Sequence, residues 1–137
     1  MEKIINAIIE NNYAFFVSLI NQYGSDIIDI DGFSPLMFCV QNGRINMIDF
    51  LLSKQIDINK KNVLGNTALF YAVYFSKNQI EIIEKLLKHG ADMNIPNNAG
   101  ITPLSLANSM GTDGLEHFAL IVTLSAISSF ALSSTNI

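Results

Sequence analysis

The sequence is poor in the residues from which most active sites, disulfides and metal centres are built. Its 137 residues include one cysteine, Cys39, and two histidines, His89 and His117. A lone cysteine excludes an intramolecular disulfide and indicates a reducing compartment. The histidines lack the spacing of a metal-ligand pair, and neither a glycine-rich phosphate loop nor an H-E-x-x-H motif occurs. We therefore predict that the protein is not an enzyme and needs no metal or cofactor.

Charged residues are also scarce, at 15 % of the chain, and the net charge is −4. The eight lysine and arginine residues are scattered, apart from the pair Lys60-Lys61. Because phosphate binding needs a clustered positive field, this distribution excludes nucleic acid as the expected ligand. A basic protein partner is compatible with the negative balance.

What the chain does contain is an internal repeat. The segments Asp31–Leu36, Leu64–Leu69 and Ala99–Leu104 align with one another, and their glycines are 33 and then 35 residues apart. Periods of this size are typical of stacked helical arrays. With 50 % hydrophobic residues, the chain has enough apolar side chains to bury the core of one domain. We predict an all-α solenoid of stacked helix-turn-helix units.

The residues around these glycines predict where helices begin and end. Each glycine is followed by a serine or threonine that can cap a helix, and in two units a proline then takes the first helical position, where its missing N–H costs nothing. These residues are Ser34-Pro35, Thr67 and Thr102-Pro103. Gly43 and Gly90 suit the positive φ that often ends a helix. His89 can bond free carbonyls at such an end.

The same positions carry a family pattern. Thr67-Ala68-Leu69 opens one unit and Gly90-Ala91-Asp92-Met93-Asn94 closes it. This resembles the ankyrin repeat, which has a T-P-L-H-x-A helix start and a G-A-D-x-N finish, and the resemblance covers about residues 5 to 115. No unit has the histidine of that pattern, so the hydrogen bonds it would give to the turns must be absent or replaced. Met37, Phe70 and Ser105 stand in its place.

The resemblance implies an ankyrin-repeat solenoid of about three full repeats in a single domain, 1–137. A degenerate N-terminal unit comes first, the second full repeat has a two-residue insertion near Phe75-Ser76-Lys77-Asn78, and the last repeat runs into an extended C-terminal capping helix. The expected units are 1–28, 29–61, 62–96 and 97–137. Cys39 takes the place of a small buried alanine, so we expect an inert thiol.

Two interpretations of the C-terminus are open. No charged residue occurs from Phe118 to Ile137, but serines interrupt the run, and a membrane span needs about 20 mainly apolar residues. Our expectation is a helix from Leu115 to Leu132 that covers the last exposed face of the stack, without membrane contact. The alternative is a tail anchor. The first residues, Met1–Asn6, do not form a secretory signal, so the expected location is the cytoplasm.

The resemblance also implies a concave recognition surface, built from the turn tips and the exposed ends of the inner helices. Several of these positions are apolar although the fold does not require it, which is typical of the core of an interface. The expected partner-binding residues are Asp31, Phe33, Gln41, Leu64, Asn66, Tyr74, Phe75, Lys77, Ile101 and Met110. The alternative is that Phe33 and Ile101 only pack neighbouring turns together.

These expectations define a non-enzymatic protein-binding module that is a monomer on its own. Abundant isoleucine and asparagine suggest a bacterial source. A small acidic ankyrin protein of that kind resembles an immunity or accessory protein that neutralises a cognate toxin, and equally an effector that engages a host target. The alternative is a membrane tail-anchored ankyrin adaptor.

Overall fold

The computed structural model describes residues 1–75 and 80–110, and these residues form seven helices and no strand. The all-α prediction is therefore confirmed. The helices are α1 (Glu2–Ile9), α2 (Tyr13–Tyr23), α3 (Pro35–Gln41), α4 (Ile45–Leu52), α5 (Ala68–Tyr74), α6 (Ile80–Lys88) and α7 (Pro103–Ser109).

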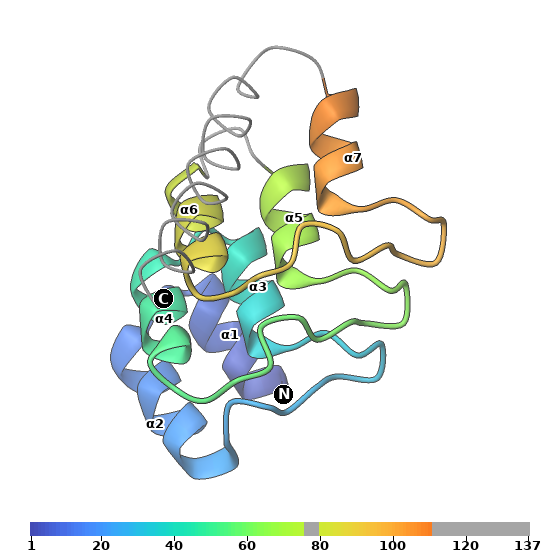
Figure 1. Ribbon diagram of the computed structural model, residues 1–137. Coiled ribbons are helices and arrows are strands. Elements are labelled where there is room, and N and C mark those ends of the chain that lie inside the picture. Colours follow the sequence, from blue (N-terminus) through green and yellow to red (C-terminus); the bar gives the residue numbers. More distant parts are fainter. Residues whose placement is uncertain (76–79, 111–137) are drawn as a thin grey trace, which may run out of the picture.

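The helices lie in two rows (Figure 1). An inner row consists of α1, α3, α5 and α7, packed one against the next, and an outer row consists of α2, α4 and α6. The segments that lead from each outer helix to the next inner helix extend to one side of the stack and return as turns. This arrangement is the predicted solenoid, and it places three turn tips along one edge of the molecule.

The predicted helix starts are confirmed. The side-chain oxygens of Ser34, Thr67 and Thr102 accept hydrogen bonds from the backbone N–H three residues further on, over 3.2, 3.3 and 3.0 Å. Pro35 and Pro103 are the first residues of α3 and α7. These helices have seven residues each. Because so short a helix is unstable alone, caps and packing between rows must hold it.

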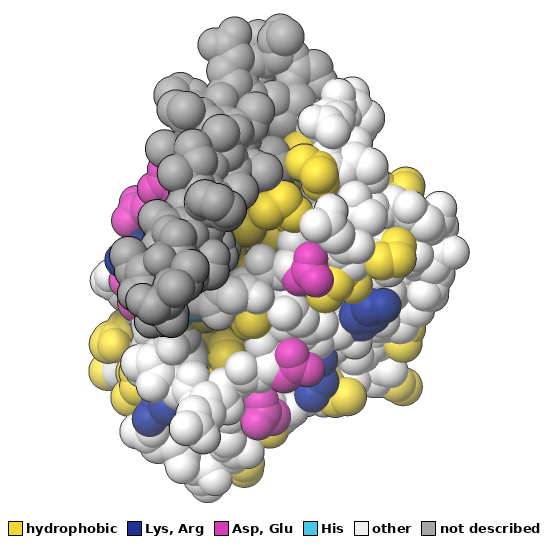
Figure 2. Space-filling view, in the orientation of Figure 1, with side chains coloured by type: hydrophobic (Ala, Val, Ile, Leu, Met, Phe, Trp, Pro, Cys, Tyr) yellow, Lys and Arg dark blue, Asp and Glu magenta, His cyan; other side chains and the backbone are white. Residues whose placement is uncertain are grey.

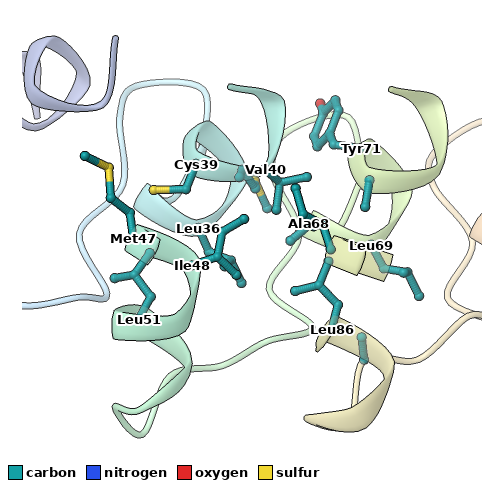
Figure 3. Packing of buried hydrophobic residues seen from close by; sticks show 14 of the residues in the cluster. Leu36, Cys39, Val40, Met47, Ile48, Leu51, Ala68, Leu69, Tyr71 and Leu86 are labelled. Atoms are coloured by element: carbon teal, nitrogen blue, oxygen red, sulfur yellow. The ribbon is translucent and has the colours of Figure 1, made fainter. Parts of the chain in front are cut away.

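The core lies between the two rows of helices (Figure 3). Leu36 of α3 lies beside Ile48 of α4, and Val40 of α3, Leu51 of α4 and Leu69 of α5 belong to the same buried cluster. All five side chains are buried, at 4 % exposure or less. Because burying such a side chain stabilises a fold by about 1.5–3 kcal/mol, each helix pair depends on its neighbours for stability.

The N-terminal unit, which the sequence analysis expects to be degenerate, contains a helix pair. α1 and α2 pack against each other, and Gly24 ends α2 with a φ of +91°. Arg44 ties this pair to the next unit, because its guanidinium donates to the carbonyl oxygens of Ile8 and Ile9 over 2.7 Å each. Gly43, with a φ of +65°, precedes that arginine and brings it to the start of α4.

Two predictions fall wholly or mostly outside the described residues. One is the insertion near Phe75-Ser76-Lys77-Asn78, of which Phe75 alone is described, and the other is the capping helix from Leu115 to Leu132. The pairs α1–α2, α3–α4 and α5–α6 fall one to each of the first three units expected from the sequence, and α7 falls in the fourth. The unit boundaries themselves stay predictions.

Candidate interaction surface

The three turns share one hydrogen-bonding plan. In each, the side-chain oxygen of the first residue accepts from the backbone N–H groups two and four residues further on. Asp29 does so over 2.9 and 2.8 Å. Asn62 does so over 3.1 and 3.1 Å, and Asn97 over 3.0 and 2.9 Å. The first turn is therefore 29–33, the second 62–66 and the third 97–101. Asparagine and aspartate favour such turns because their short side chains bond the following backbone.

Neighbouring turns are joined through their backbones. The N–H of Val63 donates to the carbonyl of Asp31 over 2.9 Å, and the N–H of Asn98 donates to the carbonyl of Leu64 over 3.0 Å. These bonds hold the turn tips side by side at a constant spacing. The side chains at the tips are thereby presented as one row.

A polar network supports the second and third turns of this chain, which lacks the histidine of the family pattern. The side-chain amides of Asn62 and Asn66 both donate to the hydroxyl of Tyr71, over 2.7 and 3.2 Å. The amide of Asn97 donates to the side-chain oxygen of Asn66 over 3.0 Å, and that of Asn98 to the carbonyl of Val63 over 2.7 Å. Reasoning from the sequence missed Tyr71, because nothing in the pattern places its hydroxyl at a turn. The excess of asparagine at the turns was the available signal.

Asn66 was expected to bind a partner, but the structure gives it a different place. Its side chain is 6 % exposed and its amide is used on both sides, by Tyr71 and by Asn97. A buried polar group engaged in this way holds the stack together. We therefore remove it from the candidate surface.

Phe33 also packs between units. Its ring lies 5.4 Å from the ring of Phe38 and 5.5 Å from the ring of Tyr71, which belongs to the next unit. The side chain is half-buried against the core. This geometry favours the alternative interpretation for Phe33, that it packs neighbouring turns together. Ile101, at the same place in the third turn, is more exposed, at 39 %.

The remaining tip residues are open to solvent. Ile30 is 95 % exposed, and Val63 and Leu64 are 58 % and 55 % exposed. Asp31 is exposed beside Ile30. Figure 2 shows hydrophobic side chains along the edge of the molecule where the turns project. An unpaired row of aliphatic side chains at adjacent tips is an apolar patch that the fold itself does not use.

The ends of the inner helices add aromatic side chains. Tyr74 and Phe75, at the end of α5, pack edge to face with ring centroids 5.0 Å apart, and Phe75 also stacks on Tyr71 at 6.5 Å. Tyr74 is 58 % exposed. Met110, after α7, is exposed, and Gln41, at the end of α3, is partly so. Lys77 lies outside the described residues.

We call the exposed tips and these helix ends the candidate surface. Its described members are Ile30, Asp31, Gln41, Val63, Leu64, Tyr74, Phe75, Ile101 and Met110. Asp31 is the one charged side chain among them.

Among the described residues, Cys39 and His89 have structural surroundings, and His117 lies outside the described residues. Cys39 is buried between the helix rows (Figure 3), and burial raises the pKa of its thiol despite the charge of Arg44. A thiol held in its protonated form is a poor nucleophile. Nδ1 of His89 lies 2.8 Å from the carbonyl oxygen of Lys85, at the end of α6. Within residues 1–75 and 80–110, no three acidic, histidine or cysteine side chains gather as metal ligands would.

Two further features of the described part bear on function. A shallow hollow of about 410 Å³ lies at the N-terminal end of the stack, lined by Met1, Ile4, Tyr23 and Ile27 among others. It brings together no cluster of catalytic or ligating side chains. None of the helices in the described ranges is long and apolar enough to cross a membrane.

Comparison with known proteins gives a consistent result. A family model described as "Ankyrin repeats (3 copies)" matches residues 4–97, which is more than half of the chain. A putative ankyrin repeat protein of Rickettsia bellii is 36 % identical over 85 residues, covering 58 % of this chain and 49 % of that protein. The B-cell lymphoma 3 protein homolog of Mus musculus is 32 % identical over 96 residues, covering 68 % of this chain and 21 % of that protein.

A putative ankyrin repeat protein of Fowlpox virus is 40 % identical over 79 residues, covering 56 % of this chain and 22 % of that protein. This chain thus spans about half or less of the length of these curated relatives.

Proposed function

We propose that this chain, which belongs to the ankyrin repeat family, is a binding module that holds a protein partner on the candidate surface without chemistry. Ankyrin repeats generally mediate protein–protein interaction. The observation that carries the proposal is the row of exposed apolar side chains at the turn tips and at the end of α5. Each of these exposed side chains is next to residues that pack or hydrogen-bond within the stack.

The geometry suits a stoichiometric binder. The backbone bonds between turns fix the row before a partner arrives, so little conformational freedom is lost on binding. Tyr74 and Phe75 pack edge to face, and exposed aromatic side chains are typical anchors of an interface. The surface is an open ridge rather than an enclosed cleft, which favours a protein over a small substrate.

The biological setting that we propose is neutralisation of a cognate toxin by an immunity or accessory protein, with an effector that engages a target protein as the other setting. Both use the same surface. A cytoplasmic location and a monomeric state belong to the same proposal. The two settings differ in genomic context, because an immunity gene adjoins the gene of its toxin. Co-expression of the neighbouring gene product with this chain, followed by copurification, tests the first.

The alternative adaptor with a membrane tail anchor depends on the uncharged segment from Phe118 onward, which lies outside the described residues. A full-length chain that partitions into vesicles would support it. A chain that stays in the aqueous phase would exclude the tail anchor and leave the binding module as the remaining proposal.

The surface is tested by matched tyrosine variants once a partner has been copurified from the native cell. Tyr74→Ala removes an anchor of the candidate surface, and we expect it to weaken binding by about 2 kcal/mol, the size typical of a central aromatic residue. Tyr23→Ala is the control, because Tyr23 is similarly exposed, at 52 %, but lies on the outer row in α2. Titration calorimetry of both variants measures the difference. A larger loss for Tyr23→Ala would move the interface away from the turns.

A further inference from the structure

The first turn has one edge that the stack leaves open. Val63 and Asn98 are the second residues of their turns, and the N–H of each donates to a carbonyl of the turn before it. Ile30 is the second residue of the first turn, and within residues 1–75 and 80–110 its N–H meets no acceptor. The bond that joins neighbouring turns is therefore available once more, at the end of the row nearest α1 and α2 (Figure 1).

The residues that lead into this turn form an exposed strand edge. In the described ranges, the backbone N–H and C=O groups of Ile28 and Ile30 have no hydrogen-bond partner. Asp29, between them, bonds instead to Phe33 and Gly32 inside its own turn. Because alternate residues of an extended chain direct these groups to the same side, Ile28 and Ile30 present them along one edge. An edge of this kind is a template for a further strand.

Apolar side chains flank this edge. Ile28 is 49 % exposed and Ile30 is 95 % exposed. Ile27, one residue before the edge, lines the hollow at the N-terminal end of the stack together with Met1 and Ile4. An extended chain advances about 3.3 Å per residue, so Ile27 and the hollow lie about 10 Å from Ile30 along the edge. A short strand can therefore reach both the open N–H and the hollow.

We propose that residues 27–30 are a docking edge for an extended apolar segment of a partner protein, which adds to the first turn as each later turn adds to the one before it. The segment runs antiparallel to the edge and pairs its backbone with Ile28 and Ile30. An aliphatic side chain, three residues beyond the residue opposite Ile30, enters the hollow. The unpaired backbone groups select a peptide, because a peptide backbone supplies alternating donors and acceptors at the matching spacing. This site goes beyond the binding that we propose for the turn tips and does not depend on it.

A second copy of this chain fits the edge less well. If Ile28 of one copy lay opposite Ile30 of the other, Asp31 would face the apolar hollow of the other copy, where a carboxylate is disfavoured. If Ile30 lay opposite Ile30, the same place would fall to Phe33, whose ring already packs on two rings of its own stack. A segment of another protein is free of both constraints.

The probe is the peptide acetyl-Lys-Thr-Val-Thr-Val-Leu-Thr-Glu-amide, whose valines can face Ile30 and Ile28 while its leucine reaches the hollow. It is titrated into the full-length, 15N-labelled protein, and NMR follows the chemical shift and the hydrogen exchange of the Ile30 amide. We expect this amide to shift and its exchange to slow when the peptide binds. The amides of Val63 and Asn98, which are bonded in the free protein, are the internal control and should change little.

Methylated peptides test whether the backbone of the peptide makes the contact. N-methylation of both valines blocks the side that faces the edge, and we expect this peptide to bind about tenfold or more weakly, since backbone hydrogen bonds are lost. N-methylation of the threonines on either side of the first valine modifies the opposite side and should leave the affinity nearly unchanged. Equal affinity of the two methylated peptides, or no shift of the Ile30 amide with the unmethylated one, would overturn the docking edge.

Variants of the protein separate the N–H of Ile30 from its side chain. Ile30→Pro removes the donor, and proline suits the second position of a β-turn, here closed by the bond from Gly32 to Asp29, so the melting temperature should be kept. Ile30→Ala keeps the donor. We expect Ile30→Pro to lose most of the peptide binding and Ile30→Ala to retain more of it.

Two outcomes would assign the edge or the peptide elsewhere. Tyr74→Ala should bind the peptide as the native protein does, and a loss equal to that of Ile30→Pro would place the peptide on the turn tips and overturn the docking edge. Protection of the Ile30 amide that rises with protein concentration, without peptide, would assign the edge to a second copy and overturn the proposal as well.

Discussion

The two junctions between the turns use different side chains for the same purpose. At the junction of the first and second turns, Phe33 packs its ring on Tyr71 of the next unit. The corresponding residue of the second turn is Asn66, which reaches the third turn through a hydrogen bond with Asn97. One junction is closed by rings and the other by amides. What they share is a backbone bond from each turn to the one before it.

This difference shows which part of the repeat is fixed by the fold. The backbone bond and the turn that positions it recur in both junctions, so they set the spacing of the tips. The side chains around them can be aromatic or polar, provided that they fill the space and satisfy each other's hydrogen bonds. The outward residues of the same turns are free of that requirement, and there the chain places Ile30, Val63 and Leu64.

The largest effect is expected from closing the space at Gly65, in the second turn. Its φ is +76°, and a Cβ there would lie 2.6 Å from the side-chain oxygen and 2.8 Å from the backbone nitrogen of Asn98. We expect Gly65→Ala to lower the free energy of unfolding by about 2–4 kcal/mol, since backbone strain of about 1–2 is added to a disrupted junction.

The control for that variant is Gly100→Ala. Gly100 has nearly the same φ, +77°, but a Cβ there would meet no atom within 4 Å. It should therefore lose only the backbone term of about 1–2 kcal/mol. Urea unfolding of both variants gives the difference. Equal losses would mean that the close approach of the second and third turns does not matter.

The aromatic junction is tested next, by Phe33→Ala. The side chain is half-buried and touches two rings, so we expect a loss of about 1.5–3 kcal/mol in the free energy of unfolding. Ile101→Ala, at the same place in the more exposed third turn, is the control and should lose clearly less. If Phe33→Ala leaves the melting temperature unchanged while a partner binds more weakly, Phe33 returns to the binding surface.

Tyr71→Phe tests the hydrogen bonds that support the amides of the second turn, and its expected effect is smaller. The hydroxyl of Tyr71 accepts from two buried amides, and its removal leaves Asn62 and Asn66 each one bond short. We expect a loss of about 1–2 kcal/mol in the free energy of unfolding. Tyr74→Phe removes a hydroxyl from an exposed ring and should change stability little. Thermal unfolding followed by circular dichroism compares the two variants. Equal stability of the two would mean that the hydrogen bonds to Tyr71 do not stabilise the fold.

Sequence reasoning succeeded where the signal is local. The caps at Ser34, Thr67 and Thr102 depend on residues within one turn of helix, and so do the glycines that end helices. The family pattern gave the stacking of the units. These features need no knowledge of which side chains meet across units.

The junctions could not be predicted, because they join residues about one repeat apart. Phe33 and Asn66 occupy equivalent places, and the sequence favoured an exposed tip position for both, with packing between turns as the alternative for Phe33 alone. Only the position of Tyr71, whose ring faces one and whose hydroxyl faces the other, shows that both are used inside the stack. The exposure of the outward residues at the turn tips, in contrast, could be predicted from their position in the repeat alone.

The smallest effect is expected on the opposite side of the stack, where the outer helices α4 and α6 are joined by an ion pair instead of a turn. Lys85 lies 2.9 Å from Asp49, and the hydrogen bond with that carboxylate raises the pKa of Lys85 above its ordinary value. A raised pKa in the folded state means that the pair adds stability while lysine is charged. That contribution is complete below the pKa of about 10.4 in the unfolded chain, and it is lost as pH rises through the folded value.

Asp49→Asn should lower the pKa of Lys85 and make the stability of the protein depend less on pH above about 10. Because the pair is exposed and screened by salt, its effect at neutral pH should be smaller than that of any variant at the turns. NMR titration of the Lys85 side chain checks the pKa, with Glu81→Gln, whose carboxylate lies 3.9 Å away, as the control. A neutral-pH loss for Asp49→Asn that equals the loss for Tyr71→Phe would show that this ion pair of the outer row stabilises the stack as much as the hydrogen bonds of Tyr71 at the turns do.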